Sequence, residues 1–306
     1  MALGNIPLET FLEIIQYLGV KDLYSLLLTA RWSSALADEQ LYKLAPKHKC
    51  EAGKGVLQWA IVQQQKKVFE RLLQANADIH SGKDSILHIL ASRGNTELMH
   101  SLLAIRNDIN FYKQNIWGET ALAVAVKENH IGIVTQLLEV GVDPFTDDYR
   151  SMLPPAMGHA IVNRNLSMLQ LLCDVKDCMV KCKNALEIAV LQPGDGKDIR
   201  LQMIRTLLDA GFDPSAMHTE ESTPLHTAAH FRLPRVLDIF LDNASNINVQ
   251  DHVGRTILHR VVQYLPEKIE RVIEAGIDTC IRDQWGKTAL DLARNQSPGV
   301  MRLLAT

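Results

Sequence analysis

Residues 221–229 read Glu221-Ser222-Thr223-Pro224-Leu225-His226-Thr227-Ala228-Ala229 and carry the signals of a helix start. The Thr223 hydroxyl is placed to accept a main-chain N–H of the first turn, and Pro224 has no N–H to leave unpaired there. Leu225 and His226 then open a short apolar helix. Looser copies occur at Ser85-Ile86-Leu87-His88, Thr120-Ala121-Leu122-Ala123, Asn184-Ala185-Leu186-Glu187, Thr256-Ile257-Leu258-His259 and Thr288-Ala289-Leu290-Asp291. The chain is therefore expected to repeat one structural unit.

A second apolar pattern recurs between these copies and predicts a second helix in each unit. An acidic or amide residue follows each of these helices at a constant offset, and Gly141, Gly211 and Gly276 occupy one column just past the helix, where a left-handed residue closes it. The helices begin their shared pattern at Phe69, Met99, Val134, Met168, Ile204, Leu237 and Ile269, and the following residues are Asp78, Asp108, Asp143, Asp177, Asp213, Asn246 and Asp278.

The T-P-L-H-x-A signature of residues 223–228 resembles that of an ankyrin repeat, a unit of about 33 residues. The resemblance implies an all-α fold, an ankyrin-repeat solenoid of about eight helix-turn-helix repeats over residues 55–306. The last repeat, from Gly286, is truncated. One repeat replaces the signature by Leu153-Pro154-Pro155-Ala156-Met157, which predicts a reshaped groove. Another inserts residues 193–197, which lack phosphate-loop spacing and are expected to form a surface loop.

Residues 1–45 do not fit the repeat and predict a small helical module, followed by a basic linker over 46–54. The order Ile6-Pro7-Leu8-Glu9, then I-I-x-x-L, D-L-x-x-L, Arg31-Trp32 and Tyr42 resembles an F-box of the fungal type. That resemblance implies docking to the Skp-type adaptor of a cullin-RING ubiquitin ligase. The implied contact residues are Ile6, Pro7, Leu8, Ile14, Leu18, Leu23 and Leu26. Alternatively, the same leucines only cap the first repeat.

Composition narrows the class of protein. The chain has 306 residues, 47% of them hydrophobic and 22% charged, with a formal net charge of −3. These values favour a globular protein, and no apolar run approaches the ~20 residues that span a bilayer. The near-neutral charge argues against nucleic-acid binding. Five unevenly placed cysteines fit a reducing compartment. We expect a cytoplasmic or nuclear protein without a membrane partner, monomeric in the absence of its adaptor.

The histidines and cysteines invite a catalytic or metal-binding interpretation. His88, His226 and His259 share one repeat position, where the ankyrin resemblance implies hydrogen bonds that tie neighbouring turns together. Cys173, Cys178 and Cys182 lack the spacing of a zinc site and are expected to be buried thiols. No metal or cofactor is predicted.

The ankyrin resemblance places variable binding residues at the finger tips and on the groove side of the first helices. Trp117 and Trp285 share one column in a turn, and exposed aromatic and Arg side chains on a rigid surface make binding hot spots. Packing of each Trp onto a neighbouring finger is the alternative. Glu119, Lys127, Glu128 and Arg255 are expected on a solvated face. The predicted partner-binding residues are Tyr112, Trp117, Tyr149, Arg150, His230, Phe231, His252, Arg255, Tyr264 and Trp285.

Three functions remain open on this pattern. The first is a non-catalytic substrate receptor of a ubiquitin ligase, which holds the adaptor with the N-terminal module and an unknown target protein in the groove. The second is an enzyme, an acid/base isomerase or cyclase, with a small-molecule pocket in the groove. The third is a plain ankyrin scaffold. The catalytic candidates of the second hypothesis are His159, His230, Asp251, His252 and Tyr264.

Overall fold

The computed structural model describes residues 56–80, 84–145, 155–193, 198–217, 222–294 and 301. The chain divides into two compact units, Met1–Pro144 and Phe145–Thr306. The F-box-like module, the linker and the adaptor-binding residues Ile6, Pro7, Leu8, Ile14, Leu18, Leu23 and Leu26 lie outside the described residues. So do Tyr149, Arg150 and most of the predicted loop at residues 193–197.

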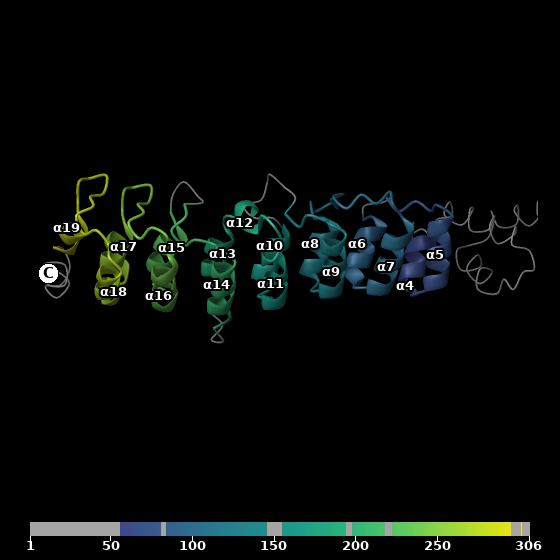
Figure 1. Cartoon of the computed structure of the whole chain (residues 1–306), viewed down its shortest axis with the longest axis horizontal. Helices are drawn as coiled ribbons and strands as arrows, with labels where there is room; N and C mark the ends of the chain where they lie inside the picture. The colour runs from purple at the N-terminus through teal and green to yellow at the C-terminus, as the bar shows by residue number, and fades with distance from the viewer. Residues whose placement is uncertain are drawn as a thin grey trace, which may run out of the picture. The chain divides into compact units, whose positions relative to one another are not determined.

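The part of unit 1 that the structure describes contains three pairs of short helices (Figure 1). Each pair has a first helix, a tight turn and a second helix that packs against the first. The first helices are α4 (Val56–Val62), α6 (Ile86–Arg93) and α8 (Ala121–Lys127). The second helices are α5 (Lys66–Gln74), α7 (Thr96–Ile105) and α9 (Ile131–Glu139). Equivalent helices of successive pairs also pack together, since α6 contacts α8 and α5 contacts α7.

Unit 2 continues the same alternation. Its first helices are α10 (Pro155–Val162), α13 (Ala185–Leu191), α15 (Pro224–His230), α17 (Ile257–Tyr264) and α19 (Ala289–Ala293). Its second helices are α11 (Leu166–Cys173), α14 (Ile199–Asp209), α16 (Pro234–Asn243) and α18 (Ile269–Glu274), the last preceded by the 3₁₀ turn η3 (Pro266–Lys268). The short α12 (Cys178–Lys181) is additional. The described residues contain no strand, which confirms the predicted all-α fold.

The predicted helix starts are confirmed. Thr223 is the N-cap of α15, its hydroxyl accepts the His226 N–H at 3.4 Å, and Pro224 occupies the first helical turn. In each looser copy the residue that replaces Thr223 is also the N-cap of its helix, although the Ser85 and Asn184 side chains accept no capping hydrogen bond. These N-caps are Ser85, Thr120, Asn184, Thr256 and Thr288. One local signal therefore sets the start of six first helices.

The second helices supply much of the core, and their ends are closed as predicted. Phe69, Met99, Val134, Ile204, Leu237 and Ile269 are all fully buried. Gly141, Gly211 and Gly276 have φ values of 84°, 95° and 88°, in the left-handed region that glycine adopts without strain. Asn76 takes the equivalent place after α5, with φ of 60°. Asn tolerates this region better than most residues, so the column extends beyond glycine.

The predicted alignment is wrong by one residue at α11. Counted from the N-cap Asn165, the buried residues Met168 and Leu169 take the places of Leu98 and Met99 in α7, so Leu169 rather than Met168 matches Met99. The connection after α11 also differs, because Asp177 has φ of 63° and precedes α12. Helix α12 buries Cys178, which gives this segment a core contact of its own.

Candidate functional site

Three turns have one common construction, and we call them finger 1 (residues 115–119), finger 2 (251–255) and finger 3 (283–287). In finger 1 the Asn115 side-chain oxygen accepts the N–H groups of Trp117 and Glu119, each at 2.9 Å. Asp251 and Asp283 bind the matching N–H groups of their own fingers at 2.9–3.0 Å. A main-chain hydrogen bond of 2.8–2.9 Å from the first residue to the fifth closes each finger. The positions within each finger are therefore held rigidly.

The first helix of one repeat also holds the finger of the next. The Nε2 atoms of His88, His226 and His259 lie 3.1, 3.0 and 3.1 Å from the carbonyl oxygens of Glu119, Arg255 and Lys287. Since a carbonyl only accepts, each Nε2 carries the proton. Each Nδ1 binds the hydroxyl of its own helix N-cap, at 2.7–2.9 Å. This geometry confirms the structural role predicted for the three histidines.

Burial keeps these imidazoles neutral. Removal from water lowers the pKa of His88, His226 and His259, and that of His226 falls from 6.5 to about 4. In addition, Nδ1 of His259 accepts the Thr256 N–H at 3.2 Å, which requires that nitrogen to be unprotonated. The three rings are consequently poor proton donors or acceptors for chemistry near neutral pH.

The finger tips carry large apolar side chains that the repeats leave in solvent. Ile116 is 62% exposed, Trp117 68% and Trp285 59%. Neither Trp is enclosed by its neighbours, although the Trp285 ring does lie against Arg255 of the preceding finger, as the packing alternative predicted. His252, at the position of Ile116 on finger 2, is also exposed.

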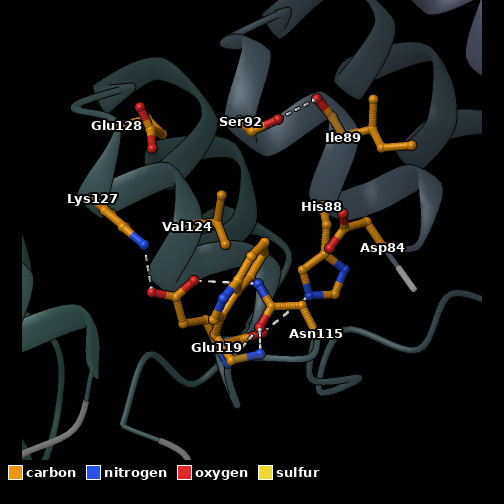
Figure 2. A pocket seen from close by; sticks show the side chains of 10 residues that line it. Asp84, His88, Ile89, Ser92, Asn115, Glu119, Val124, Lys127 and Glu128 are labelled. Atoms are coloured by element: carbon orange, nitrogen blue, oxygen red, sulfur yellow. Dashed lines mark hydrogen bonds and ion pairs between the residues drawn. The ribbon is translucent and has the colours of Figure 1, made fainter.

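A cleft of about 200 Å³ lies in unit 1 between finger 1 and the helices α6 and α8 (Figure 2). Its walls combine one exposed indole, three carboxylates and one ammonium group with apolar side chains from both helices. The lining residues are Asp84, His88, Ile89, Ser92, Asn115, Trp117, Glu119, Val124, Lys127 and Glu128. Asp84 was missed by the sequence argument, although it directly precedes the N-cap Ser85, as Glu119 directly precedes the N-cap Thr120.

Glu119 corrects one sequence expectation, because it is buried rather than solvated. Its Oε1 accepts from Lys127 Nζ at 2.9 Å and its Oε2 from the Asn115 side-chain amide at 3.2 Å (Figure 2). Lys127 is partly exposed, and both residues of this pair line the cleft. The two charges compensate one another, which lets a carboxylate remain in a poorly hydrated position.

In unit 2, an arginine lies against the exposed indole of finger 3. The Arg255 guanidinium carbon is 5.2 Å from the centre of the Trp285 ring, within the range of a cation–π interaction. Arg255 Nε also lies 3.6 Å from the Asp283 carboxylate, an ion pair beyond hydrogen-bond length. Only 21% of the Arg255 side chain is exposed, so this residue also departs from the expected solvated face.

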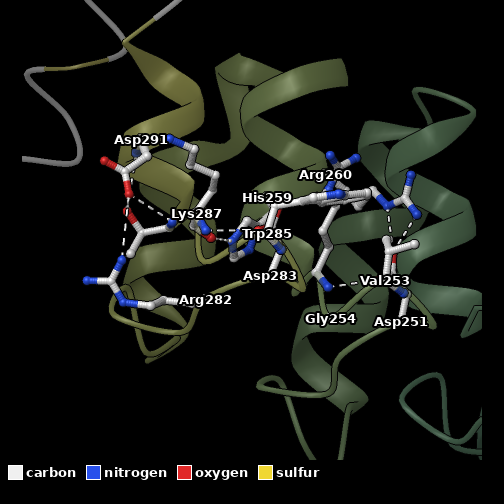
Figure 3. Close-up of polar contacts among 12 residues, drawn as sticks. Asp251, Val253, Gly254, His259, Arg260, Arg282, Asp283, Trp285, Lys287 and Asp291 are labelled. Carbon is white, nitrogen blue, oxygen red and sulfur yellow. Dashed lines mark hydrogen bonds and ion pairs between the residues drawn. The ribbon is translucent and has the colours of Figure 1, made fainter.

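The Asp251 carboxylate has a structural role. It is 5% exposed, and besides its two main-chain bonds it accepts from Arg260 Nε at 2.9 Å (Figure 3). Burial alone would raise the pKa of Asp251, but the hydrogen bonds from the Arg255 main chain and from Arg260 hold it below the usual 3.8. Arg260 was not identified from the sequence, since an Arg within an amphipathic helix carries no distinguishing pattern.

The other predicted groove residues that the structure describes do not line the cleft. The His230 ring meets those of Phe231 and Tyr264 edge to face, with centres 5.1 and 4.9 Å away, and forms an aromatic cluster at the ends of α15 and α17. Tyr112, in unit 1, accepts the Asp143 N–H at its hydroxyl, 3.3 Å away.

The residues proposed for catalysis are not gathered into one site. His159 lies on α10, which packs against α13, whereas His230 lies on α15, on the other side of α13. Asp251 is occupied by the bonds described above. His230 and Tyr264 do meet, but in an exposed aromatic contact.

The cysteines of unit 2 are thiols, of which Cys178 and Cys182 are buried and Cys173 is partly exposed. Within the ranges that the structure describes, no cluster of three or more His, Cys, Asp or Glu residues is arranged to hold a metal ion. Over the same ranges, no helix combines the length and the apolar character needed to cross a bilayer.

Parts of this chain are similar to known ankyrin-repeat proteins. A family model described as "Ankyrin repeats (3 copies)" matches residues 57–148, and one described as "Ankyrin repeat" matches residues 220–252. The B-cell lymphoma 3 protein homolog of Mus musculus is 30% identical over 161 residues, which cover 52% of this chain and 35% of that protein. The E3 ubiquitin-protein ligase KEG of Arabidopsis thaliana is 24% identical over 221 residues, 68% of this chain and 13% of the ligase.

The structural comparison agrees. An ankyrin repeat protein from Leishmania major superposes with a TM-score of 0.51 at 22% identity, and the match covers 67% of this chain and 74% of that one. This likeness shows the fold. The chain spans about a third of the length of this mouse relative. The finger construction, the histidine contacts and the family matches together show that this chain is built from ankyrin repeats in an all-α fold.

Proposed function

We propose that this protein is an interaction scaffold that binds a partner protein through its fingers and first helices. Ankyrin repeats are stacked units that present extended binding surfaces, and they supply protein-interaction scaffolds. The observation that carries the proposal is Trp117, an indole 68% exposed on a finger that is hydrogen-bonded at both ends.

The physical argument rests on rigidity and exposure together. A large aromatic side chain in water contributes nothing to folding, whereas its burial by a partner removes apolar surface from water at about 25 cal/mol per Å². Because finger 1 is already ordered, binding there loses little main-chain entropy. The adjacent cleft provides a concave surface beside the ring.

The proposal is tested by quantitative co-purification of the tagged protein from cells. Trp117→Ala and Trp285→Ala are compared with Val140→Ala, which also removes an exposed apolar side chain but lies at the end of a second helix. We expect one set of proteins to be lost with either Trp variant and retained with Val140→Ala. An identical set for all three variants would exclude the finger surface as the binding site.

We further propose a specific use of this scaffold, as a substrate receptor of a cullin-RING ubiquitin ligase. The support is the F-box-like pattern between Ile6 and Tyr42, which lies outside the described residues, together with the similarity to a protein named as an E3 ubiquitin-protein ligase. The N-terminal module would hold a Skp-type adaptor while the fingers hold the target, which raises the effective concentration of the target near the transferring enzyme.

Co-expression with a Skp-type adaptor, followed by size-exclusion chromatography with light scattering, tests this use. A one-to-one complex is expected for the wild type. Ile6→Asp and Leu23→Asp should abolish it, and Trp117→Ala should leave it intact. Elution of the wild-type chain apart from the adaptor would remove the ligase proposal and leave the scaffold proposal standing.

A further inference from the structure

The two exposed indoles of the fingers differ in their neighbours. Trp285 on finger 3 has the guanidinium of Arg255 against its face, 5.2 Å from the ring centre. Arg255 is the last residue of the preceding finger and directly precedes the N-cap Thr256. This contact shows how the repeat geometry brings the residue before one N-cap to the indole of the following finger.

In unit 1 the corresponding position holds an acid. Asp84 directly precedes the N-cap Ser85, as Arg255 precedes Thr256, and Trp117 lies on the finger that follows. Both Asp84 and Trp117 line the cleft. The residue at the position of Arg255 is therefore a carboxylate, and it shares a cleft with Trp117.

The cleft as a whole carries negative charge. Asp84, Glu119 and Glu128 are acidic and Lys127 is basic, which leaves an excess of two negative charges among the lining residues. Lys127 is paired with Glu119 at 2.9 Å. The remaining lining histidine, His88, is neutral because burial lowers its pKa. The carboxylates of Asp84 and Glu128 form no hydrogen bond or ion pair with the residues that the structure describes.

We propose that this cleft binds an arginine side chain of the partner protein, with its guanidinium against the Trp117 ring and hydrogen-bonded to Asp84. The inference rests on the scaffold function proposed above and specifies the side chain that is recognised. An aromatic face attracts a cation, and a carboxylate beside it adds charge-assisted hydrogen bonds. Arginine fits both groups better than lysine, because its planar guanidinium stacks on a ring and pairs with a carboxylate through two N–H groups.

The test is a selection from a displayed library of random peptides on the wild-type protein, followed by affinity measurements on the variants. Selected peptides whose binding depends on Trp117 should share an arginine. Replacement of that arginine by citrulline, which removes the charge, should weaken binding. Asp84→Asn should weaken binding roughly tenfold, the typical loss of a charge-assisted hydrogen bond. Asp84→Arg should weaken it further, because the new side chain can occupy the face of Trp117 as Arg255 occupies that of Trp285.

Matched controls separate recognition from folding. Val140→Ala, which removes an exposed apolar side chain outside the fingers, should leave the affinity unchanged, and each variant should keep the melting temperature of the wild type. Direct contact is read from the indole N–H resonance of Trp117 in a proton–nitrogen correlation spectrum, which should move on peptide addition while that of Trp285 stays in place. The same resonance should not move in the Asp84→Arg variant.

The outcomes distinguish this inference from the function on which it rests. Peptides that depend on Trp117 but lack arginine, or that bind Asp84→Asn as tightly as the wild type, overturn arginine recognition and keep the scaffold function. Selected peptides whose binding is indifferent to Trp117→Ala overturn both the cleft and its proposed ligand.

Discussion

Nε2 of His226, in α15, donates a hydrogen bond to the main-chain carbonyl of Arg255, 29 residues further along the chain and 3.0 Å away. The bond joins the first helix of one repeat to the finger of the next, and Thr223 holds the ring from the other side at 2.8 Å. Each finger therefore depends on the repeat before it for its position. The binding surface and the stability of the stack are consequently coupled.

His226→Ala should destabilise the protein by about 2–3 kcal/mol, because it leaves the Arg255 carbonyl and the Thr223 hydroxyl buried without this partner. Urea unfolding followed by circular dichroism measures the change. The control is His100→Ala on the exposed side of α7, which should change stability by no more than ~0.5 kcal/mol. Equal effects of the two substitutions would contradict the structural role of His226.

Acidification should destabilise the protein before its carboxylates titrate. Burial lowers the pKa of His226 from 6.5 to about 4, so between these pH values the unfolded chain binds a proton that the folded protein does not. This contribution to stability is present above pH 6.5 and is lost as the pH falls toward 4, by up to ~1.4 kcal/mol per pH unit for each such histidine. The pKa values of His88 and His259 are lowered in the same direction.

Melting temperatures at closely spaced pH values between 4 and 7.5 test this expectation. The wild type should lose stability across the window, and His226→Gln should lose less. The pKa of Asp251 lies below 3.8, so this carboxyl contributes only at the acid end of the window. A wild-type melting temperature that stays constant down to pH 4.5 would show that the histidines are not buried as described.

Asp251→Ala should cost about 3–5 kcal/mol, because it leaves Arg260, whose side chain is only 15% exposed, without its carboxylate. The substitution also removes the side chain that holds finger 2. Asp242→Ala is the matched comparison, since Asp242 pairs with Arg271 on the surface and its loss should cost about 1 kcal/mol or less. A small effect of Asp251→Ala would reopen the assignment of this residue to catalysis.

Substitutions at two glycines with similar φ values separate the stability cost of main-chain strain from that of a steric clash. Gly94 and Gly141 have φ of 67° and 84°. A Cβ at Gly94 would lie 2.6 Å from Cε1 of His130, whereas nothing lies within 4 Å of one at Gly141. Gly141→Ala should cost ~1 kcal/mol from the left-handed main chain alone, and Gly94→Ala about 2–3 kcal/mol, since the ring must also move. Equal costs in urea unfolding would show that the His130 ring adapts freely.

Local signals determined most of the fold in advance. The N-cap of a first helix and the glycine after a second helix each act within a few residues, so both can be recognised in the sequence. Thr223 and Gly141 are examples. Even there, the pattern failed at α11. Met168 and Leu169 are both apolar, and only their distance from the N-cap Asn165 shows which of them matches Met99.

The sequence predicted the types of residue at the candidate site but not the contacts that they make. The sequence placed Trp117 and Trp285 in one column, but it could not say that Arg255 covers one ring and that Asp84 stands beside the cleft of the other. Likewise, Glu119 was expected on a solvated face and Asp251 was a catalytic candidate, and only the structure shows that they pair with Lys127 and Arg260. The sequence by itself determined the repeat, because its signals are local. The tertiary structure decided the burial and partners of each finger, because these depend on side chains, some eight or nine and others about thirty residues apart, that meet only when the helices and repeats pack together.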